Sequence, residues 1–238
     1  MNIIIFGATG SIGRHLVDQA LSQGHNVTAF ARDPARISVQ HANLAKYAGD
    51  VLDPDAVSKA VAGHDAVLIA LGAGRKGGIR SAGTKNVIDG MVQHGVKRLV
   101  CETTLGAGDS YGVLNFFWKR LMFGLLLRPA FADHQAQEIH IRDSGLDWVI
   151  VRPAAFTDGP ATDDYQHGFA ATERTLTFKI SRADVAGFML RQLADNTYLH
   201  RTPGLSYARP AIPVRPAKSR RLAAACGRGS CRQLSRQS

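Results

Sequence analysis

Residues 3–13 read IIIFGATGSIG, and this stretch decides the fold. Four apolar residues typical of a β-strand run directly into a turn that has three glycines, Gly7, Gly10 and Gly13. Apolar residues then recur at helical spacing from Ser11 to Gln23, and Gly24 is placed to end that helix. The order of strand, glycine turn and helix predicts the first βα unit of a parallel sheet.

The same alternation continues to about residue 150, with short apolar runs such as AVLIAL at residues 66–71. Runs without polar residues are typical of strands buried on both faces. We therefore expect an α/β fold with a doubly wound parallel sheet, a Rossmann fold, and a small C-terminal substrate-binding region. The expected strands are Ile3–Phe6, Asn26–Ala31, Ala45–Ala48, Ala66–Leu71, Arg98–Thr103 and Trp148–Val151.

The second half of the chain is expected to contain fewer regular elements. Its pattern predicts helices over Leu114–Leu127 and Phe131–Ser144, which the pair Arg128-Pro129 separates. A loop-rich region over 156–178 precedes a last helix, Arg182–Leu193, that Ser181 caps. We expect one domain over residues 1–207, with the substrate region from about residue 150 onward.

Residues 208–238 differ in composition from the rest. They contain seven arginines and Lys218 but no acidic residue, and so carry most of the net charge of +10. Three prolines and little periodicity predict a disordered basic tail. The tail has no aromatic side chain on which a base could stack, so nucleic-acid binding is not expected.

The composition excludes several classes of protein. Of the 238 residues, 45% are hydrophobic and 20% charged, which is typical of a globular chain. Three cysteines, a brief apolar start unlike a signal peptide, and an apolar run at Leu114–Leu127 too short for a bilayer predict a cytoplasmic protein. The histidines show no metal-ligand spacing, so no metal site is expected, and no Gly-x-Ser-x-Gly hydrolase elbow is present.

The glycine turn predicts a dinucleotide site. Glycines at this spacing let the chain bend sharply, let a diphosphate approach the backbone, and let the helix pack closely on the sheet. The helix start adds free N–H groups and partial positive charge.

Residues after the second strand predict which dinucleotide binds. Arg32 occupies the position that meets the adenosine ribose, and Arg36 follows four residues later. Guanidinium groups suit a 2′-phosphate, which favours NADP(H) over NAD(H). Asp33 is the counter-evidence, and its other role is to start the turn before Pro34.

Two more strand ends are expected to line the cofactor crevice, because ligands bind beyond the carboxyl ends of parallel strands. Asp50 and Val51 follow the third strand, and Asp50 is placed to meet the adenine amino group. Leu71 and Gly72 follow the fourth, where small residues leave room for ribose and diphosphate.

With these motifs, residues 1–207 resemble the atypical short-chain dehydrogenase/reductase superfamily, in the NAD(P)H-binding branch that includes NmrA-like proteins and biliverdin-IXβ (flavin) reductases. The more specific parts of the resemblance are SGLDWVIVRP at residues 144–153 and ISRADVA at residues 180–186. The resemblance implies cofactor contacts at Gly7, Thr9, Gly10, Ile12, Arg32, Arg36, Asp50, Val51, Leu71 and Gly72. It also implies nicotinamide or substrate contacts at Thr103, Thr104, His134, Pro153 and Phe156. Ala155 stands where the flavin reductase has a histidine, which argues against the same tetrapyrrole substrate.

The usual catalytic pair of short-chain dehydrogenases, Tyr-x-x-x-Lys, is missing. Tyr111 is followed four residues later by Asn115, and the next lysine is Lys119. His134 and Glu138 stand where NmrA-like proteins have Lys-x-x-x-Glu. His134 is thus a candidate to donate a hydrogen bond or a proton near the nicotinamide, or a packing histidine between helices.

Hydride transfer to a conjugated ring requires mainly that two planar groups be held together without water. We therefore expect an NADPH-dependent reductase of a flavin, quinone or similar small acceptor, with Thr104 and His134 as catalytic residues. One alternative is an NmrA-like redox sensor that binds NADP(H) without turnover. A less favoured alternative is a sugar-nucleotide epimerase or dehydratase, against which the missing tyrosine argues. The sequence does not indicate an oligomeric state.

Overall fold

The computed structural model, which describes residues 1–72, 77–107, 127–170, 172–173 and 175–209, is built around an eight-stranded sheet. The strand order is β3-β2-β1-β4-β5-β6-β10-β8. These strands are β1 (Asn2–Phe6), β2 (Asn26–Ala31), β3 (Leu44–Ala48), β4 (Ala66–Ile69), β5 (Arg98–Glu102), β6 (Asp147–Pro153), β8 (Gln166–His167) and β10 (Gly204–Ser206). Only the edge pair β8 and β10 is antiparallel among the described strands. The predicted doubly wound parallel sheet is therefore confirmed.

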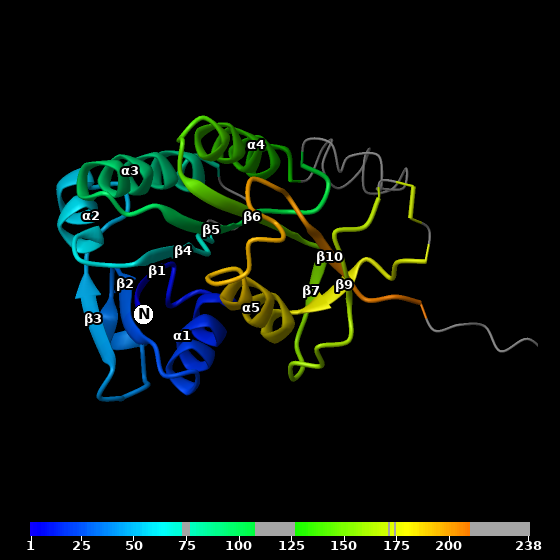
Figure 1. Cartoon of the computed structure of the whole chain (residues 1–238), viewed down its shortest axis with the longest axis horizontal. Helices are drawn as coiled ribbons and strands as arrows, with labels where there is room; N and C mark the ends of the chain where they lie inside the picture. Colours follow the sequence, from blue (N-terminus) through cyan, green and yellow to red (C-terminus); the bar gives the residue numbers. More distant parts are fainter. Residues whose placement is uncertain (73–76, 108–126, 171, 174, 210–238) are drawn as a thin grey trace, which may run out of the picture.

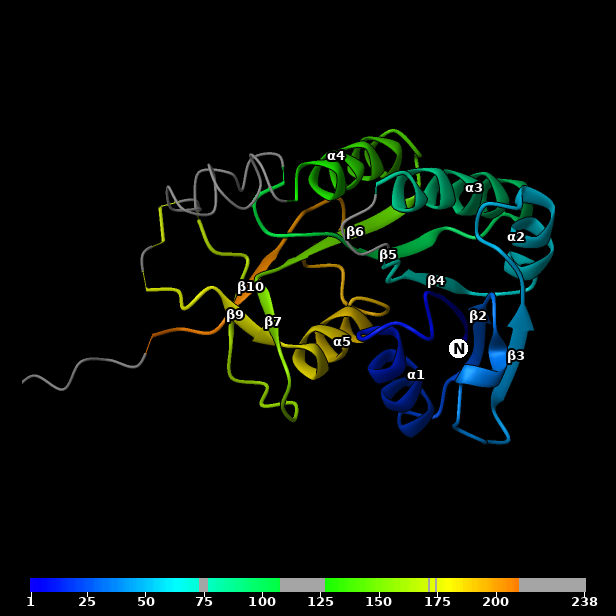
Figure 2. The same ribbon diagram turned by 180° about the vertical axis from the view of Figure 1, so that it is seen from behind.

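Helices cover both faces of the sheet (Figures 1 and 2). One face carries α1 and α5, and the other carries α2, α3 and α4. Their bounds are α1 (Gly13–Ser22), α2 (Pro54–Val61), α3 (Ile79–His94), α4 (Arg128–Arg142) and α5 (Arg182–Arg191), with a short 3-10 helix η1 at Pro34–Arg36. In the part of the chain that the structure describes, no helix is long and apolar enough to cross a membrane.

Strand β1 is the centre of the core because its side chains are buried on both faces. Ile3 and Ile5 pack with α1 and α5, whereas Ile4 and Phe6 pack with α2 and α3. All four side chains are fully buried. The uniformly apolar sequence of the strand follows from this position, since both of its faces contribute to hydrophobic stability.

The predicted element boundaries need small corrections. α1 begins at Gly13 rather than Ser11, and α4 begins at Arg128 rather than Phe131. Pro129 fits the first turn of α4, because a first-turn residue needs no N–H partner in the helix. The predicted helix over 114–127 lies, except for Leu127, outside the described residues.

The C-terminal region adds a small second sheet to the loop-rich segment. β7 (Ala155–Thr157) pairs in parallel with β9 (Lys179–Ser181). The side chain of Ser181 accepts a hydrogen bond from the amide of Asp184, so the predicted cap of α5 is confirmed. This region places residues of the predicted substrate segment beside the end of β6.

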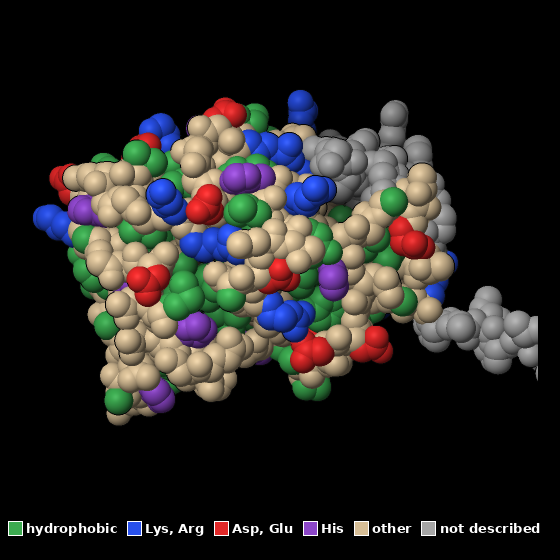
Figure 3. All heavy atoms as spheres, in the orientation of Figure 1, with side chains coloured by type: hydrophobic (Ala, Val, Ile, Leu, Met, Phe, Trp, Pro, Cys, Tyr) green, Lys and Arg blue, Asp and Glu red, His purple; other side chains and the backbone are tan. Residues whose placement is uncertain are grey.

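Charged groups of both signs are distributed over the described surface. On the face shown in Figure 3, basic and acidic side chains are interspersed with apolar ones. Of the predicted basic tail, only Ala208 and Arg209 are described, and Arg209 Nε donates to the carbonyl of Leu176. Residues 210–238 lie outside the described part.

Candidate functional site

Two hollows adjoin at the carboxyl edge of the sheet. The first, which we call the inner cavity, has a volume of about 350 Å³, and the second, the outer groove, has about 260 Å³. Gly10, Leu71 and Gly72 line both hollows, so one elongated ligand can occupy the two together. This edge is where ligands bind in parallel sheets.

The glycine turn lies between the two hollows and forms a close junction of strand and helix. Gly7 has a φ of +86°, a conformation that favours glycine. A Cβ on Gly7 would collide with the carbonyl of Ala70, and a Cβ on Gly13 would collide with the carbonyl of Gly7. The predicted roles of these two glycines, a sharp bend and close packing of the helix, are therefore confirmed.

The amino end of α1 is suited to a phosphate. Ile12, the residue just before the helix, provides no side-chain cap. No acidic residue lies in the first turn of the helix. The N–H groups and the positive end of the helix dipole therefore have no negative side chain of the helix itself beside them. Gly72 adds open space opposite, since nothing lies within 4 Å of where its Cβ would be.

The outer groove contains the residues predicted for the adenosine half of a cofactor. Arg32 and Arg36 both line it and are exposed. Asp33 caps η1, its Oδ1 accepting from the amide of Ala35 at 3.2 Å, so the turn role considered for it is the one found. Asp50 Oδ1 similarly accepts from the amide of Leu52 at 3.0 Å. Thr9 and Val51 complete this set in the groove wall.

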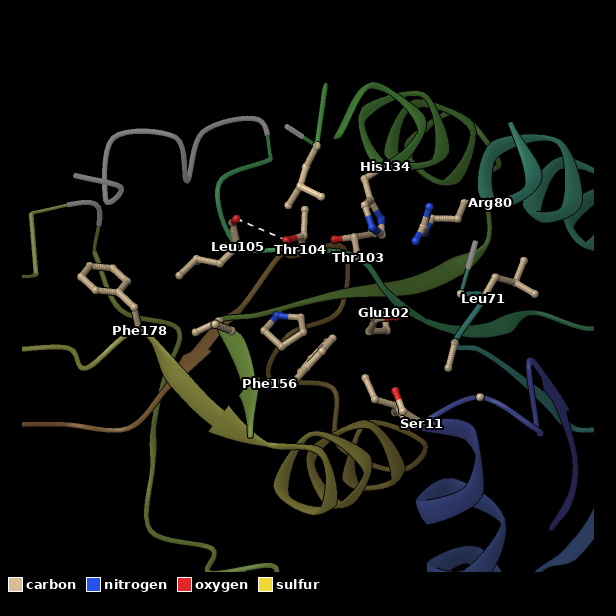
Figure 4. A pocket seen from close by; sticks show the side chains of 18 residues that line it. Ser11, Leu71, Arg80, Glu102, Thr103, Thr104, Leu105, His134, Phe156 and Phe178 are labelled. Atoms are coloured by element: carbon tan, nitrogen blue, oxygen red, sulfur yellow. Dashed lines mark hydrogen bonds between the residues drawn. The ribbon is translucent and has the colours of Figure 1, made fainter. Parts of the chain in front are cut away.

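The inner cavity has a polar side and an apolar side (Figure 4). The polar side is formed by residues from the end of β5 and the loop after it, the start of α3 and the middle of α4: Arg80, Glu102, Thr103, Thr104 and His134. The apolar side comes from the β5 loop, the start of α4 and the C-terminal region: Leu105, Leu127, Pro153, Phe156 and Phe178. A flat ring with polar edges matches this division.

The apolar wall is fixed by contacts outside the cavity. Phe178 has a φ of 58°, which is uncommon for a bulky residue. Hydrogen bonds on both sides hold it there: its amide donates to Ser206 Oγ, and its carbonyl accepts from the amide of Ala155. The guanidinium of Arg182 lies 5.4 Å from the ring centroid of Phe156. Both phenyl rings are thus positioned by the C-terminal region.

Thr103 and Thr104 are neighbours with different hydrogen bonds. Thr103 is buried, and its hydroxyl donates to Glu138 Oε1 at 3.0 Å. The hydroxyl of Thr104 has a long contact of 3.5 Å to the carbonyl of Leu105. Of the two hydroxyl groups predicted for the site, the one on Thr104 is therefore the better placed to bind a ligand.

His134 lies in the cavity wall, as predicted, but it is uncharged at neutral pH. Burial, followed by the nearby charge of Arg80, lowers the pKa of His134 to about 4. Its Nδ1 lies 3.2 Å from Gln137 Oε1, and Gln137 in turn donates to Thr84 of α3 at 2.9 Å. The structure thus favours the hydrogen-bonding role of His134 over the proton-donating role.

Asp133 joins α3 to α4 behind the cavity. Its carboxylate accepts from the amides of Arg80 and Ser81 at 3.1 and 3.0 Å, which caps the first turn of α3. Arg80 Nη1 also lies 3.6 Å from this carboxylate. The side chain of Arg80 is thereby held beside His134.

Sequence reasoning missed Glu102 and Arg80, both of which line the inner cavity. Burial raises the pKa of Glu102 to about 8, although the charge of Arg80 acts in the opposite direction. The available signal was an acidic residue at the end of the otherwise apolar run LVCE, just before the paired threonines.

In the described part of the chain, no three His, Cys, Asp or Glu side chains gather as a metal site requires.

A match to a protein family agrees with this geometry. Residues 7–196 match the family described as NAD(P)H-binding, which is more than half of the chain. The chain belongs to the NAD(P)H-binding family. Its glycine turn, open helix end and arginine-lined groove fit a dinucleotide, with the glycine cradle as the observation that decides the fit.

Individual relatives cover most of this NAD(P)H-binding chain. It is 25% identical over 205 residues to UPF0659 protein YMR090W of Saccharomyces cerevisiae, covering 81% of this chain and 87% of the yeast protein. Several other curated relatives are longer, and the chain spans between 15% and 61% of their length.

Solved structures share the fold. A Rossmann-fold NAD(P)-binding family protein from Shigella flexneri is 28% identical, with a TM-score of 0.66 over 89% of this chain and 94% of that chain. ChuY, an anaerobillin reductase from Escherichia coli O157:H7, is 24% identical, with a TM-score of 0.72 over 91% of this chain and 100% of that chain. The likeness to ChuY shows the fold alone.

Proposed function

We propose that this protein is an NADPH-dependent reductase of a flavin, a quinone or a similar flat, conjugated small molecule. The observation that carries the proposal is the continuity of the two hollows through Gly10, Leu71 and Gly72. A dinucleotide seated on the glycine turn reaches from the arginines of the outer groove into the inner cavity. The remainder of the inner cavity is left for an acceptor.

NADPH is the preferred cofactor in this proposal because of Arg32 and Arg36. Both line the outer groove, and guanidinium groups form paired hydrogen bonds with a phosphate dianion. Asp33, which would repel that phosphate, is engaged by the amide of Ala35.

The nicotinamide group supplies hydride when it is bound, and the chain positions the two reactants. Phe156 and Phe178 exclude water from one side of the acceptor, while Thr104 offers a hydroxyl to a polar edge. A conjugated acceptor takes up the electron pair itself, so the fold needs no Tyr-x-x-x-Lys pair. The resemblance to flavin reductases agrees with a flavin or quinone as acceptor, whereas Ala155 in place of their histidine argues against a tetrapyrrole.

Purified protein mixed with NADPH and one acceptor at a time tests the proposal by loss of the nicotinamide absorbance. FMN, riboflavin, a soluble quinone and a linear tetrapyrrole are the acceptors, with NADH as the parallel cofactor. We expect turnover with at least one acceptor and a higher kcat/KM with NADPH. Binding of NADPH without turnover on any of them contradicts the reductase and supports an NmrA-like sensor.

A further inference from the structure

Glu102 is the one carboxylic acid among the described residues that line the inner cavity. It is the last residue of β5, and it pairs in register with Val151 of β6. Strand side chains alternate, so Glu102 points to the same face as Val100, toward α1 and α5. This is the face on which the glycine turn lies. Hydride transfer from the nicotinamide does not itself require this carboxyl group.

Figure 4 shows Glu102 at the base of the inner cavity, between Leu71 on one side and Phe156 on the other. Leu71 lines both hollows, and Phe156 belongs to the apolar wall. Glu102 therefore lies where the cofactor half and the acceptor half of the site meet. A group at this junction is within reach of the nicotinamide and acceptor sites that the proposed function assigns to the cavity.

The surroundings of Glu102 favour its neutral form. Its side chain is only 8% exposed, and burial disfavours a carboxylate. Arg80 of α3 and His134 of α4 line the same cavity from the other face of the sheet, and Arg80 is the charged group that acts on Glu102. His134 is uncharged at neutral pH, and Asp133 lies against Arg80. At neutral pH Glu102 holds a proton, because its pKa is raised to about 8.

We propose that Glu102 is the catalytic acid of the reductase and donates a proton to the acceptor bound in the inner cavity. This inference rests on the proposed function and adds to it the source of the proton. Reduction of a conjugated acceptor requires a hydride and a proton. His134 is a weaker candidate because its ring hydrogen-bonds to Gln137 and carries no spare proton.

The balance of the step is complete with the components named. The acceptor gains two electrons and one hydrogen as hydride from the reduced cofactor. The O–H bond of Glu102 breaks, and that proton bonds to the acceptor atom at the other end of the conjugated system. The resulting carboxylate regains a proton from water, and the cofactor leaves oxidised. One NADPH and one proton from solvent are consumed for each acceptor reduced.

The test compares the full-length wild type with Glu102→Gln, Glu102→Asp and a control, Asp89→Asn. Gln has the shape of a protonated Glu but no acidic proton, and Asp keeps the acid on a shorter side chain. Asp89 is exposed on α3, is paired with Lys85 and does not line the cavity. Circular dichroism and the NADPH dissociation constant establish that each variant folds.

We expect Glu102→Gln to lower kcat by about 100-fold or more, the usual range for loss of a general acid. The NADPH dissociation constant and the activity of Asp89→Asn should stay within about twofold of wild type. Wild-type kcat should fall above a pH of about 8, where Glu102 loses its proton. The residual activity of Glu102→Gln should lack this fall, and Glu102→Asp should retain part of the wild-type rate.

Infrared spectroscopy supplies a readout that does not depend on turnover. The wild type at neutral pH should show the C=O band of a protonated carboxyl that is absent in Glu102→Gln and is lost in alkaline buffer. If the wild type reduces an acceptor but shows no protonated band, or if Glu102→Gln is as active as the wild type, this inference is overturned and the reductase stands. A wild type that binds NADPH but transfers hydride to none of the acceptors overturns the proposed function and this inference together.

Discussion

Arg152 and Glu138 form a buried ion pair behind the inner cavity, with Nη2 of Arg152 2.6 Å from Oε2 of Glu138. Arg152 is 1% exposed and also donates from Nε to Glu138 Oε1 at 2.9 Å. The same carboxylate accepts the hydroxyl of Thr103. This pair joins α4 to β6 and sets the direction of the Thr103 side chain.

Replacing Glu138 should destabilise the protein strongly. Glu138→Gln replaces the carboxylate that accepts from both Nε and Nη2 of the buried Arg152, and breaking such a pair lowers the free energy of unfolding by about 3–5 kcal/mol. The control is Arg142→Ala, because Arg142 contacts the same carboxylate at 3.3 Å but is 43% exposed. We expect a change of about 0–1 kcal/mol there. Urea denaturation measures the free energy of unfolding of both variants. Equal losses of stability in the two would contradict a dominant role for the buried pair.

Local sequence patterns were sufficient to predict the glycine turn, the arginine of the outer groove and the cap of α5. The glycine turn, Arg32 and the cap at Ser181 each depend on residues close in sequence, so spacing alone identifies them. The direction of a strand side chain and the meeting of two helices depend on contacts distant in sequence. Asp133 caps α3 from 52 and 53 residues away, and no local signal predicts this.

Glu102 shows the same limit within a strand. It ends an apolar strand whose other residues form the core, so its sequence context resembles that of a packing residue. β5 ends at Glu102, one residue before the expected end at Thr103, and its last side chain lines the inner cavity at the open edge of the sheet. The role of Thr103 likewise depends on Glu138, which is 35 residues away.

Asp184 should make stability depend on acid pH. Burial acts to raise the pKa of Asp184, but hydrogen bonds from Tyr207, the amides of Asp163 and Thr162, and Ser181 outweigh it, so the pKa lies below the ordinary value of 3.8. A lowered pKa in the folded state contributes stability at pH values above 3.8, and this contribution is lost as the pH falls further.

Asp184→Asn should therefore lower the free energy of unfolding by about 2 kcal/mol at neutral pH, and by less at a pH of about 3. Asp158→Asn is the matched control, since Asp158 pairs with Arg182 at 2.7 Å but is 96% exposed. Its effect should stay near zero. Urea titrations at the two pH values decide, and a deficit that is the same at both would show that the charge of Asp184 is not responsible.

Arg32 should determine the choice between the two dinucleotides. Arg32→Asp removes charge-assisted hydrogen bonds to the 2′-phosphate, so the dissociation constant for NADPH should rise by about 10- to 100-fold. That for NADH should change by about twofold. Lys59→Asp makes the same change in net charge on α2, outside both hollows, and should leave both constants nearly unaltered. Calorimetry measures the dissociation constants. If Arg32→Asp weakens the binding of NADPH and NADH equally, Arg32 does not bind the 2′-phosphate.

Gly72 and Gly13 should separate cofactor binding from folding. Gly72 lines both hollows, and a methyl group there meets no protein atom within 4 Å, so Gly72→Ala should change the free energy of unfolding by less than about 1 kcal/mol. The methyl group would occupy space needed by the dinucleotide and weaken its binding by about tenfold.

Gly13→Ala places a methyl group against the backbone of Gly7 and should lower the free energy of unfolding by roughly 1–3 kcal/mol. Thermal unfolding with and without NADPH checks both variants, and undiminished stabilisation of Gly72→Ala by NADPH would show that the dinucleotide does not cross the junction between the two hollows.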